Sequence, residues 1–75
     1  MTVAKRFGYN LSLARAEAGM TQMELCAKVS LSRVTLSRYE NGKANPHLDQ
    51  LAKLAEAVGV QVRDLLYGIG DGSER

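Results

Sequence analysis

The chain has 75 residues, 45% of them hydrophobic and 24% charged, with a formal net charge of +2, one Cys, one Pro and no Trp. This length allows one small domain, and a single cysteine, Cys26, excludes an internal disulfide and any multi-cysteine zinc site. One thiol and one imidazole, Cys26 and His47, leave little room for metal chemistry, and we expect no metal, cofactor or small-molecule ligand. The single cysteine, the lack of a signal peptide and the lack of an apolar stretch of roughly 20 residues predict a cytoplasmic protein.

Apolar residues recur at helical spacing through most of the chain, which predicts an all-α fold of five short helices. The first helix is expected over residues 3–18 and ends at Gly19, a residue type that often follows a helix. One face of this helix is predicted to be buried. That face comprises Phe7, Leu11, Ala14 and Ala18.

A capping box predicts where the second helix begins. The Thr21 hydroxyl and the Glu24 carboxylate can each satisfy a backbone N–H group that the first helical turn leaves free. The second helix is therefore expected over residues 22–29, with Leu25 and Val29 facing inward.

The third helix follows after a very short turn. Ser32 is a favourable N-cap, so this helix is expected over residues 33–40, and the Asn41-Gly42 pair ends it. Leu36 and Tyr39 share one side of the helix and are expected to anchor it to the core.

Pro46 restarts the chain, since proline tolerates the first turn of a helix. The fourth helix is expected over residues 47–58 and the fifth over residues 61–67. The apolar side of the fourth helix comprises Leu48, Leu51, Leu54, Ala55 and Val58. The domain is thus predicted to span residues 1–68, with a flexible tail over residues 69–75.

Two short helices joined by a tight turn, the second of them polar and basic, are typical of a DNA-binding helix-turn-helix. At about 100° per residue, one side of the third helix is rich in hydrogen-bond donors. Arginine can grip guanine with two bonds, serine can donate or accept, and a valine methyl can pack on thymine. The candidate base-reading residues are Arg33, Val34, Ser37 and Arg38. Without further context, such arginines are more often plain solvated charges.

Residues that flank this face are suited to phosphate. Gln22 begins a helix, where its amide and free backbone N–H groups can reach a phosphate oxygen. Asn41 and Lys43 follow the third helix, and Ser32 precedes it. Residues 1–45 also carry seven basic and three acidic side chains, whereas the remainder carries three basic and five acidic ones, which indicates an anionic partner for the N-terminal part.

Three segments carry a resemblance to a known family: residues 19–25, 32–43 and 51–60, which read GMTQMEL, SRVTLSRYENGK and LAKLAEAVGV. In this order and spacing they resemble the phage-repressor-type (Xre/Cro) helix-turn-helix family, which includes lambdoid repressors and restriction–modification controller proteins. The resemblance covers about residues 7 to 68 and implies a lambda-repressor-like fold. It also implies base-reading and phosphate-contacting roles. Those roles fall on Arg33, Val34 and Arg38 for bases and on Gln22, Asn41 and Lys43 for phosphates.

The resemblance further implies an ion pair between Arg15 and Glu40 that joins the first helix to the end of the recognition helix. Two positions depart from the family pattern. Cys26 stands where many relatives carry Ala, and as a small hydrophobe it fits the core. Ser30 stands where many carry Gly with a positive φ, which serine adopts at some energetic cost.

These features predict a sequence-specific transcription regulator, not an enzyme, whose partner is double-stranded DNA. One recognition helix reads too few base pairs for useful specificity, so we expect a homodimer on a pseudo-palindromic operator. The dimer surface is expected at Val62, Leu66, Tyr67 and Ile69. The alternative is an antitoxin-like module that binds a partner protein and regulates its own operon. Only eight residues follow Tyr67, which disfavours a segment that wraps a partner.

Overall fold

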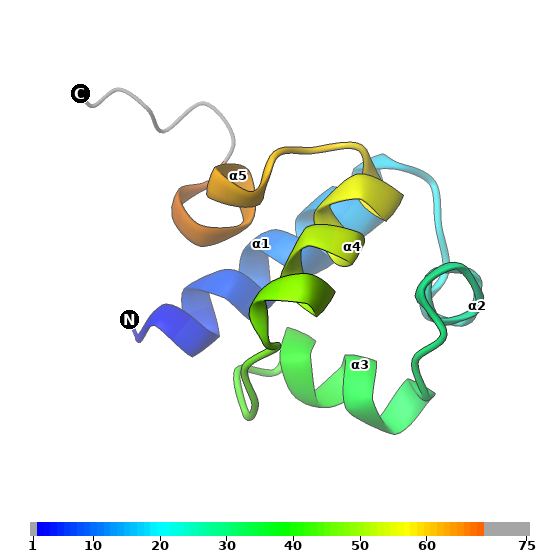
Figure 1. Cartoon of the computed structure of the whole chain (residues 1–75), viewed down its shortest axis with the longest axis horizontal. Coiled ribbons are helices and arrows are strands. Elements are labelled where there is room, and N and C mark those ends of the chain that lie inside the picture. The colour runs from blue at the N-terminus through cyan, green and yellow to red at the C-terminus, as the bar shows by residue number, and fades with distance from the viewer. Residues whose placement is uncertain (1, 69–75) are drawn as a thin grey trace.

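The computed structural model describes residues 2–68, which form five helices and no strand (Figure 1). The helices are α1 (Val3–Glu17), α2 (Gln22–Val29), α3 (Arg33–Glu40), α4 (Leu48–Val58) and α5 (Val62–Tyr67). The predicted all-α class is confirmed. None of these helices has the length and apolar character needed to cross a membrane. The predicted tail, residues 69–75, lies outside the described residues.

The starts of α2 and α3 are fixed by the caps that the sequence predicts. At α2, the Thr21 backbone N–H donates to Glu24 Oε1 at 2.8 Å, and the Glu24 N–H donates to Thr21 Oγ1 at 3.1 Å. At α3, Ser32 Oγ accepts from the Thr35 N–H at 3.1 Å. Both helices have the predicted bounds, because short-range hydrogen bonds determine where each begins.

The ends of α1 and α4 differ from the predictions. Ala18 is exposed and caps α1, so its expected place in the buried stripe is wrong. Leu48 is 82% exposed, so its expected place on the buried side of α4 is also wrong. The imidazole of His47 is the N-cap, with Nδ1 accepting from the Gln50 N–H at 3.3 Å. Helical periodicity predicts which side of a helix faces inward, but not how far the core extends along its axis.

The five helices share one hydrophobic core. α1 contacts both α3 and α5, and α2 contacts both α3 and α4, so α3 is held from two sides. Phe7 packs edge-on against Tyr39, with 6.0 Å between ring centroids. The largest fully buried side chains are Phe7, Leu11, Leu25, Leu36, Leu54 and Leu65.

Gly8 sets the distance between α1 and α3. A Cβ atom at this position would lie 2.2 Å from the carbonyl oxygen of Tyr39 and 2.8 Å from that of Glu40. Both neighbours are backbone atoms, which cannot move aside without displacing α3. The absence of a side chain at Gly8 therefore allows α1 to pack directly on the C-terminal end of α3.

The turn between α2 and α3 contains Ser30, the only non-glycine residue with positive φ in the described part of the chain. Its backbone is left-handed, with φ 58° and ψ 45°, as expected from its place in the family pattern. The following residue, Leu31, donates its N–H to the Cys26 carbonyl at 3.0 Å, which closes the C-terminal end of α2. A left-handed serine is thus what brings α3 across α2.

Candidate nucleic-acid interface

The inner face of α3 is anchored as predicted. Leu36 is fully buried and Tyr39 is 6% exposed. The Tyr39 hydroxyl donates to Gln50 Oε1 on α4 at 2.6 Å, which ties the same face to a second helix. With Gly8 close behind it, α3 has one packed side and one free side.

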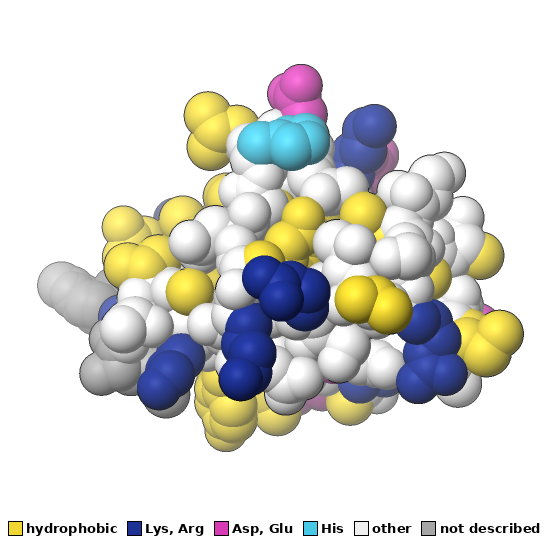
Figure 2. All heavy atoms as spheres, turned by 90° about the horizontal axis from the view of Figure 1, so that it is seen from below, with side chains coloured by type: hydrophobic (Ala, Val, Ile, Leu, Met, Phe, Trp, Pro, Cys, Tyr) yellow, Lys and Arg dark blue, Asp and Glu magenta, His cyan; other side chains and the backbone are white. Residues whose placement is uncertain are grey.

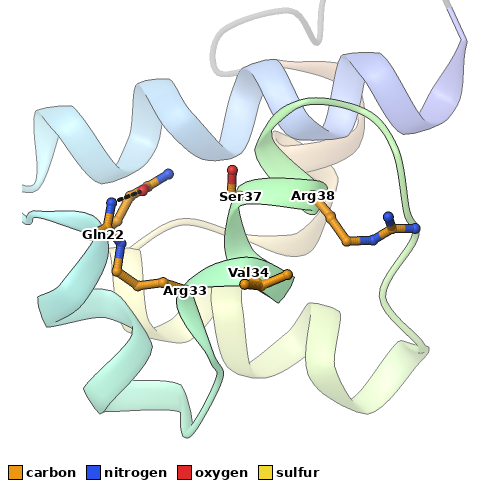
Figure 3. Close-up of a pocket in the computed structure, with 5 residues that line it drawn as sticks. All are labelled: Gln22, Arg33, Val34, Ser37 and Arg38. Carbon is orange, nitrogen blue, oxygen red and sulfur yellow. Dashed lines mark hydrogen bonds between the residues drawn. The ribbon is translucent and has the colours of Figure 1, made fainter.

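The free side of α3 brings the four base-reading candidates together with Gln22. These five residues line one shallow groove of about 380 Å³ (Figure 3). Val34 is 71% exposed, and Arg33 and Arg38 are exposed at opposite ends of α3. Figure 2 views the molecule from this side and shows Lys and Arg side chains across the face, with acidic side chains only towards its rim.

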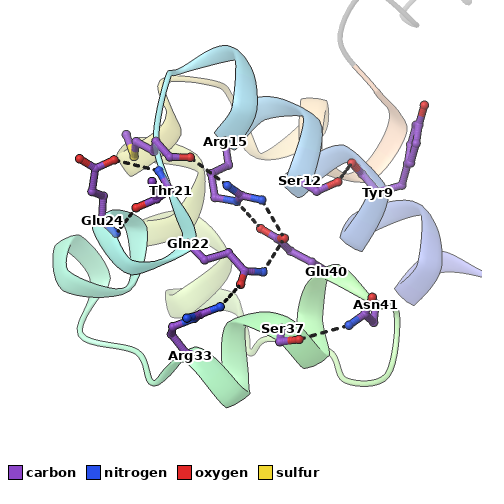
Figure 4. A network of polar contacts seen from close by, with 11 residues as sticks. Tyr9, Ser12, Arg15, Thr21, Gln22, Glu24, Arg33, Ser37, Glu40 and Asn41 are labelled. Carbon is purple, nitrogen blue, oxygen red and sulfur yellow. Dashed lines mark hydrogen bonds and ion pairs between the residues drawn. The ribbon is translucent and has the colours of Figure 1, made fainter.

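Behind this face, the structure pairs Arg15 of α1 with Glu40 at the end of α3 (Figure 4). Arg15 Nε donates to Glu40 Oε2 at 2.7 Å, and Arg15 Nη2 donates to Oε1 at 3.2 Å. Arg15 Nη1 also donates to the Met20 carbonyl at 2.8 Å. Only 19% of the Arg15 side chain and 8% of the Glu40 side chain are exposed, so the pair is well shielded from water.

Gln22 connects that ion pair to Arg33, a link that the sequence did not predict. Gln22 Nε2 donates to Glu40 Oε1 at 3.0 Å, and Gln22 Oε1 accepts from Arg33 Nη2 at 3.2 Å (Figure 4). The three residues come from α2 and from both ends of α3. No spacing rule within one helix reports such a contact, because it depends on how α2 and α3 cross.

Three more of the candidate side chains, those of Ser37, Arg38 and Asn41, are also held by hydrogen bonds. Arg38 Nη2 donates to the Lys43 carbonyl at 3.2 Å, so this guanidinium is directed towards the loop after α3, away from Arg33 (Figure 3). Asn41 Nδ2 donates to Ser37 Oγ at 3.2 Å. The Lys43 side chain is exposed.

Ser32 is exposed at the start of α3, and its hydroxyl lies within this local network of caps. Ser32 Oγ donates to Thr35 Oγ1 at 2.9 Å while it accepts from the Thr35 backbone N–H. Both groups belong to the first turn of the helix. The hydroxyl therefore already serves a structural role at the edge of the exposed face.

Cys26 lies in the core behind α3 and is 6% exposed. Burial raises the pKa of its thiol, while the positive charge of Arg33 opposes this and the negative charge of Glu40 adds to it. The thiol is therefore protonated and poorly nucleophilic at neutral pH. Among residues 2–68, no group of three or more His, Cys, Asp or Glu side chains could hold a metal ion.

The residues expected at a dimer surface that the structure describes fall into two environments. Val62 and Leu66 are partly buried and pack against the core. Tyr67 is 62% exposed. Ile69 lies outside the described residues.

A short α2, a tight turn and a core-anchored α3 with an exposed polar face define the helix-turn-helix class of DNA-binding proteins. A family model described as helix-turn-helix matches residues 11–65. The chain belongs to this family, and it is a DNA-binding regulator, not an enzyme.

Similar proteins agree with this assignment. An uncharacterised HTH-type transcriptional regulator, y4dJ of Sinorhizobium fredii, is 38% identical over 66 residues, which cover 88% of this chain and 86% of that protein. The clp gene regulator ClgR from C. glutamicum is 29% identical with a TM-score of 0.87, and the match covers 100% of this chain and 95% of that one. The restriction–modification controller protein C.AhdI from Aeromonas hydrophila is 31% identical with a TM-score of 0.77, over 83% and 94% of the two chains. The resemblance to controller proteins is therefore confirmed.

Proposed function

We propose that the protein binds a pseudo-palindromic operator as a homodimer, with α3 in the major groove of each half-site. The observation that carries this proposal is the single exposed face of α3, on which Arg33, Val34, Ser37 and Arg38 line one groove while the opposite face is packed. A helix held on one side and free on the other can enter a groove of DNA without loss of the core.

Each side chain on this face has a base edge that it suits. Arg33 and Arg38 each offer a planar fork of N–H donors for O6 and N7 of guanine. Ser37 can donate to or accept from a base, and the exposed methyl groups of Val34 can pack on the methyl group of thymine.

Phosphate contacts are proposed for the residues around this face: Gln22, Ser32, Asn41 and Lys43. Gln22 is the first residue of α2, where free backbone N–H groups favour an anion. Lys43 adds an exposed positive charge beyond the other end of α3. Contacts with the two phosphate backbones of the DNA, one on either side of α3, would fix the depth of the helix in the major groove. Such contacts carry no sequence information.

The homodimer surface is proposed at α5 and the residues after it: Val62, Leu66, Tyr67 and Ile69. The exposed ring of Tyr67 supports this assignment, since an aromatic side chain of this kind is favoured in interfaces. Val62 and Leu66 are packed against the core but remain partly exposed. In a cell, binding to an operator would place the protein with the DNA of the bacterial nucleoid.

The test is selection of binding sites from random duplexes with the full chain, followed by sedimentation with the selected duplex. We expect two inverted half-sites about 10 bp apart and two protein chains per duplex. Arg33→Ala and Arg38→Ala should each cost about 1–3 kcal/mol of specific binding and relax preference at one base pair. If the chain selects no duplex, or if both variants keep the base preferences of the unaltered protein, the role of α3 as recognition helix is refuted. A protein partner that co-purifies in fixed stoichiometry would instead favour the antitoxin-like alternative.

A further inference from the structure

We infer that Lys5, on the first turn of α1, is a further phosphate-contacting residue, so that the DNA-binding surface extends from α3 onto α1. Its partner is the sugar–phosphate backbone of the duplex that α3 enters. The inference rests on the proposed function, because it takes Lys43 and the loop around it to lie against DNA. The sequence pattern does not point to Lys5, since the contact that places it joins two segments far apart in the chain.

Gly42, in the loop after α3, is where Lys5 meets this surface. A Cβ atom at Gly42 would lie 2.6 Å from Cγ of Lys5 and 2.9 Å from its Cα. The first turn of α1 therefore packs directly on the backbone of the loop, at a distance that only a residue without a side chain permits. Figure 1 shows this end of α1 and the loop between α3 and α4 on the same side of the molecule. Because Lys43 is the next residue, the contact sets Lys5 beside a proposed phosphate contact.

The loop is in turn fixed to the end of α3. The Gly42 N–H donates to the Tyr39 carbonyl at 3.1 Å, and the Lys43 N–H donates to the Arg38 carbonyl at 2.8 Å. The Arg38 guanidinium donates back to the Lys43 carbonyl at 3.2 Å. Lys5 therefore keeps a constant place relative to α3, and a recognition helix seated in the major groove brings Lys5, together with Lys43, to the DNA backbone.

The charges around Lys5 favour an anionic partner from outside the protein. Residues 1–16 hold three basic side chains and no acidic one, and residues 41–48 hold one lysine, Lys43, and no acidic side chain. The acidic residue just before the loop, Glu40, is 8% exposed and already belongs to an ion pair. Lys5 and Lys43 are both exposed. The part of DNA that attracts such charges is its phosphate backbone, which releases counterions when they bind.

The chemistry of lysine at this place suits a phosphate oxygen and not a base edge. Its ammonium group is a compact charge with three donors on a flexible stem, which binds phosphate as a point charge. The stem of Lys5 starts on α1 and packs on the loop, whereas the base-reading candidates all lie on α3. Lys5 should therefore strengthen binding on every sequence alike, because phosphate contacts carry no sequence information.

The experiment measures the affinity of the full chain and of Lys5→Ala for the selected duplex, at salt concentrations from about 50 to about 200 mM. Each lost phosphate contact reduces the slope of log K against log salt by about 0.9. We expect this reduction for every protein chain bound, so Lys5→Ala should lose about 3.5-fold less affinity per chain over this range than the unaltered protein. Base preferences should be unchanged at every position. Lys5→Arg keeps the charge and should keep the slope.

Lys53→Ala is the matched control, since it removes the same charge from another exposed lysine. Lys53 lies on α4 and lines a groove between α2 and α4 with Lys28 and Glu56, apart from the loop that Lys5 contacts. The salt dependence of this variant should equal that of the unaltered protein. Thermal unfolding of both alanine variants checks that the fold is intact, so that a difference between them is one of binding.

Replacement of single phosphates by neutral methylphosphonates then locates the contact on the duplex. A neutral group at the phosphate bound by Lys5 should weaken binding of the unaltered protein but not of Lys5→Ala. That phosphate should neighbour the one that Lys43→Ala assigns in the same way, because Lys5 and Lys43 lie on either side of Gly42.

An unchanged slope for Lys5→Ala, or a change equal to that of Lys53→Ala, would overturn the inference. A changed base preference would overturn it as well, because it would place Lys5 at a base. In each of these cases Lys43→Ala and Arg33→Ala keep their effects, and the proposed function stands. If the chain selects no duplex, the proposed function fails and the inference fails with it.

Discussion

Removal of either partner of the Arg15–Glu40 pair should destabilise the domain strongly. Glu40 accepts bonds from Arg15 Nε, from Arg15 Nη2 and from Gln22 Nε2, and only 8% of its side chain is exposed. A shielded charge whose partner is deleted keeps its desolvation cost without its compensation, which typically costs about 3–5 kcal/mol. Because Arg15 retains 19% exposure, we expect the lower end, about 3 kcal/mol, for Glu40→Ala.

Arg15→Ala should cost somewhat more than Glu40→Ala. It leaves the more shielded of the two charges, Glu40, with only the Gln22 amide as its partner, and it also removes the bond to the Met20 carbonyl. A domain of this size has a total stability of about 4–11 kcal/mol, so a loss of about 3 kcal/mol removes between about a quarter and about three quarters of it. Urea unfolding followed by circular dichroism gives both free energies, provided that the m-value is unchanged.

The double variant Arg15→Met with Glu40→Leu is the decisive comparison. Replacement of both charges by apolar side chains leaves no unpaired charge, so the double variant should be more stable than either alanine variant. Costs below about 1 kcal/mol for both single changes would show that the pair behaves as an exposed one and would refute the reasoning. A double variant that loses the sum of the single costs would also refute it.

Three further changes test other parts of the fold. Gly8→Ala should destabilise the domain by more than about 2 kcal/mol, because the Cβ of the new alanine would lie 2.2 Å from the Tyr39 carbonyl oxygen. Thermal unfolding measures this, and an unchanged melting temperature would mean that α1 can move away from α3 freely. Ser30→Gly should stabilise by about 0.5–1 kcal/mol, since glycine adopts φ 58° without strain, and a loss of stability in urea would show that the serine is not strained. Because the pKa of Cys26 is raised, the folded state favours the protonated thiol, and this contribution to the free energy of unfolding should be complete below the ordinary thiol pKa and be lost as pH rises through the raised pKa. Cys26→Ala should remove this pH-dependent loss of stability, and a variant with the same pH profile as the unaltered protein would contradict the assignment.

Much of the fold follows from short-range signals. The Thr21–Glu24 capping box and the Ser32 cap predicted the bounds of α2 and α3, because their hydrogen bonds span only three residues. Leu36 and Tyr39 were predicted as anchors because they share a side of one short helix. The sequence missed the exposure of Leu48, since whether the core reaches the first turn of α4 depends on the neighbouring elements.

The sequence by itself determined the class of this protein: one small all-α domain whose short, basic third helix resembles a recognition helix. The sequence also showed that the modest net charge of +2 is divided unevenly, with an excess of basic side chains in residues 1–45 and of acidic ones in residues 46–75. Only the tertiary structure decided how the candidates are held, with Arg33 supported by Gln22 and Glu40, and Arg38 by the Lys43 carbonyl. The physical reason is that periodicity and caps act within one helix, whereas these bonds depend on how helices cross. That crossing is determined by contacts between helices, such as the close approach of α1 to α3 that the missing side chain of Gly8 allows.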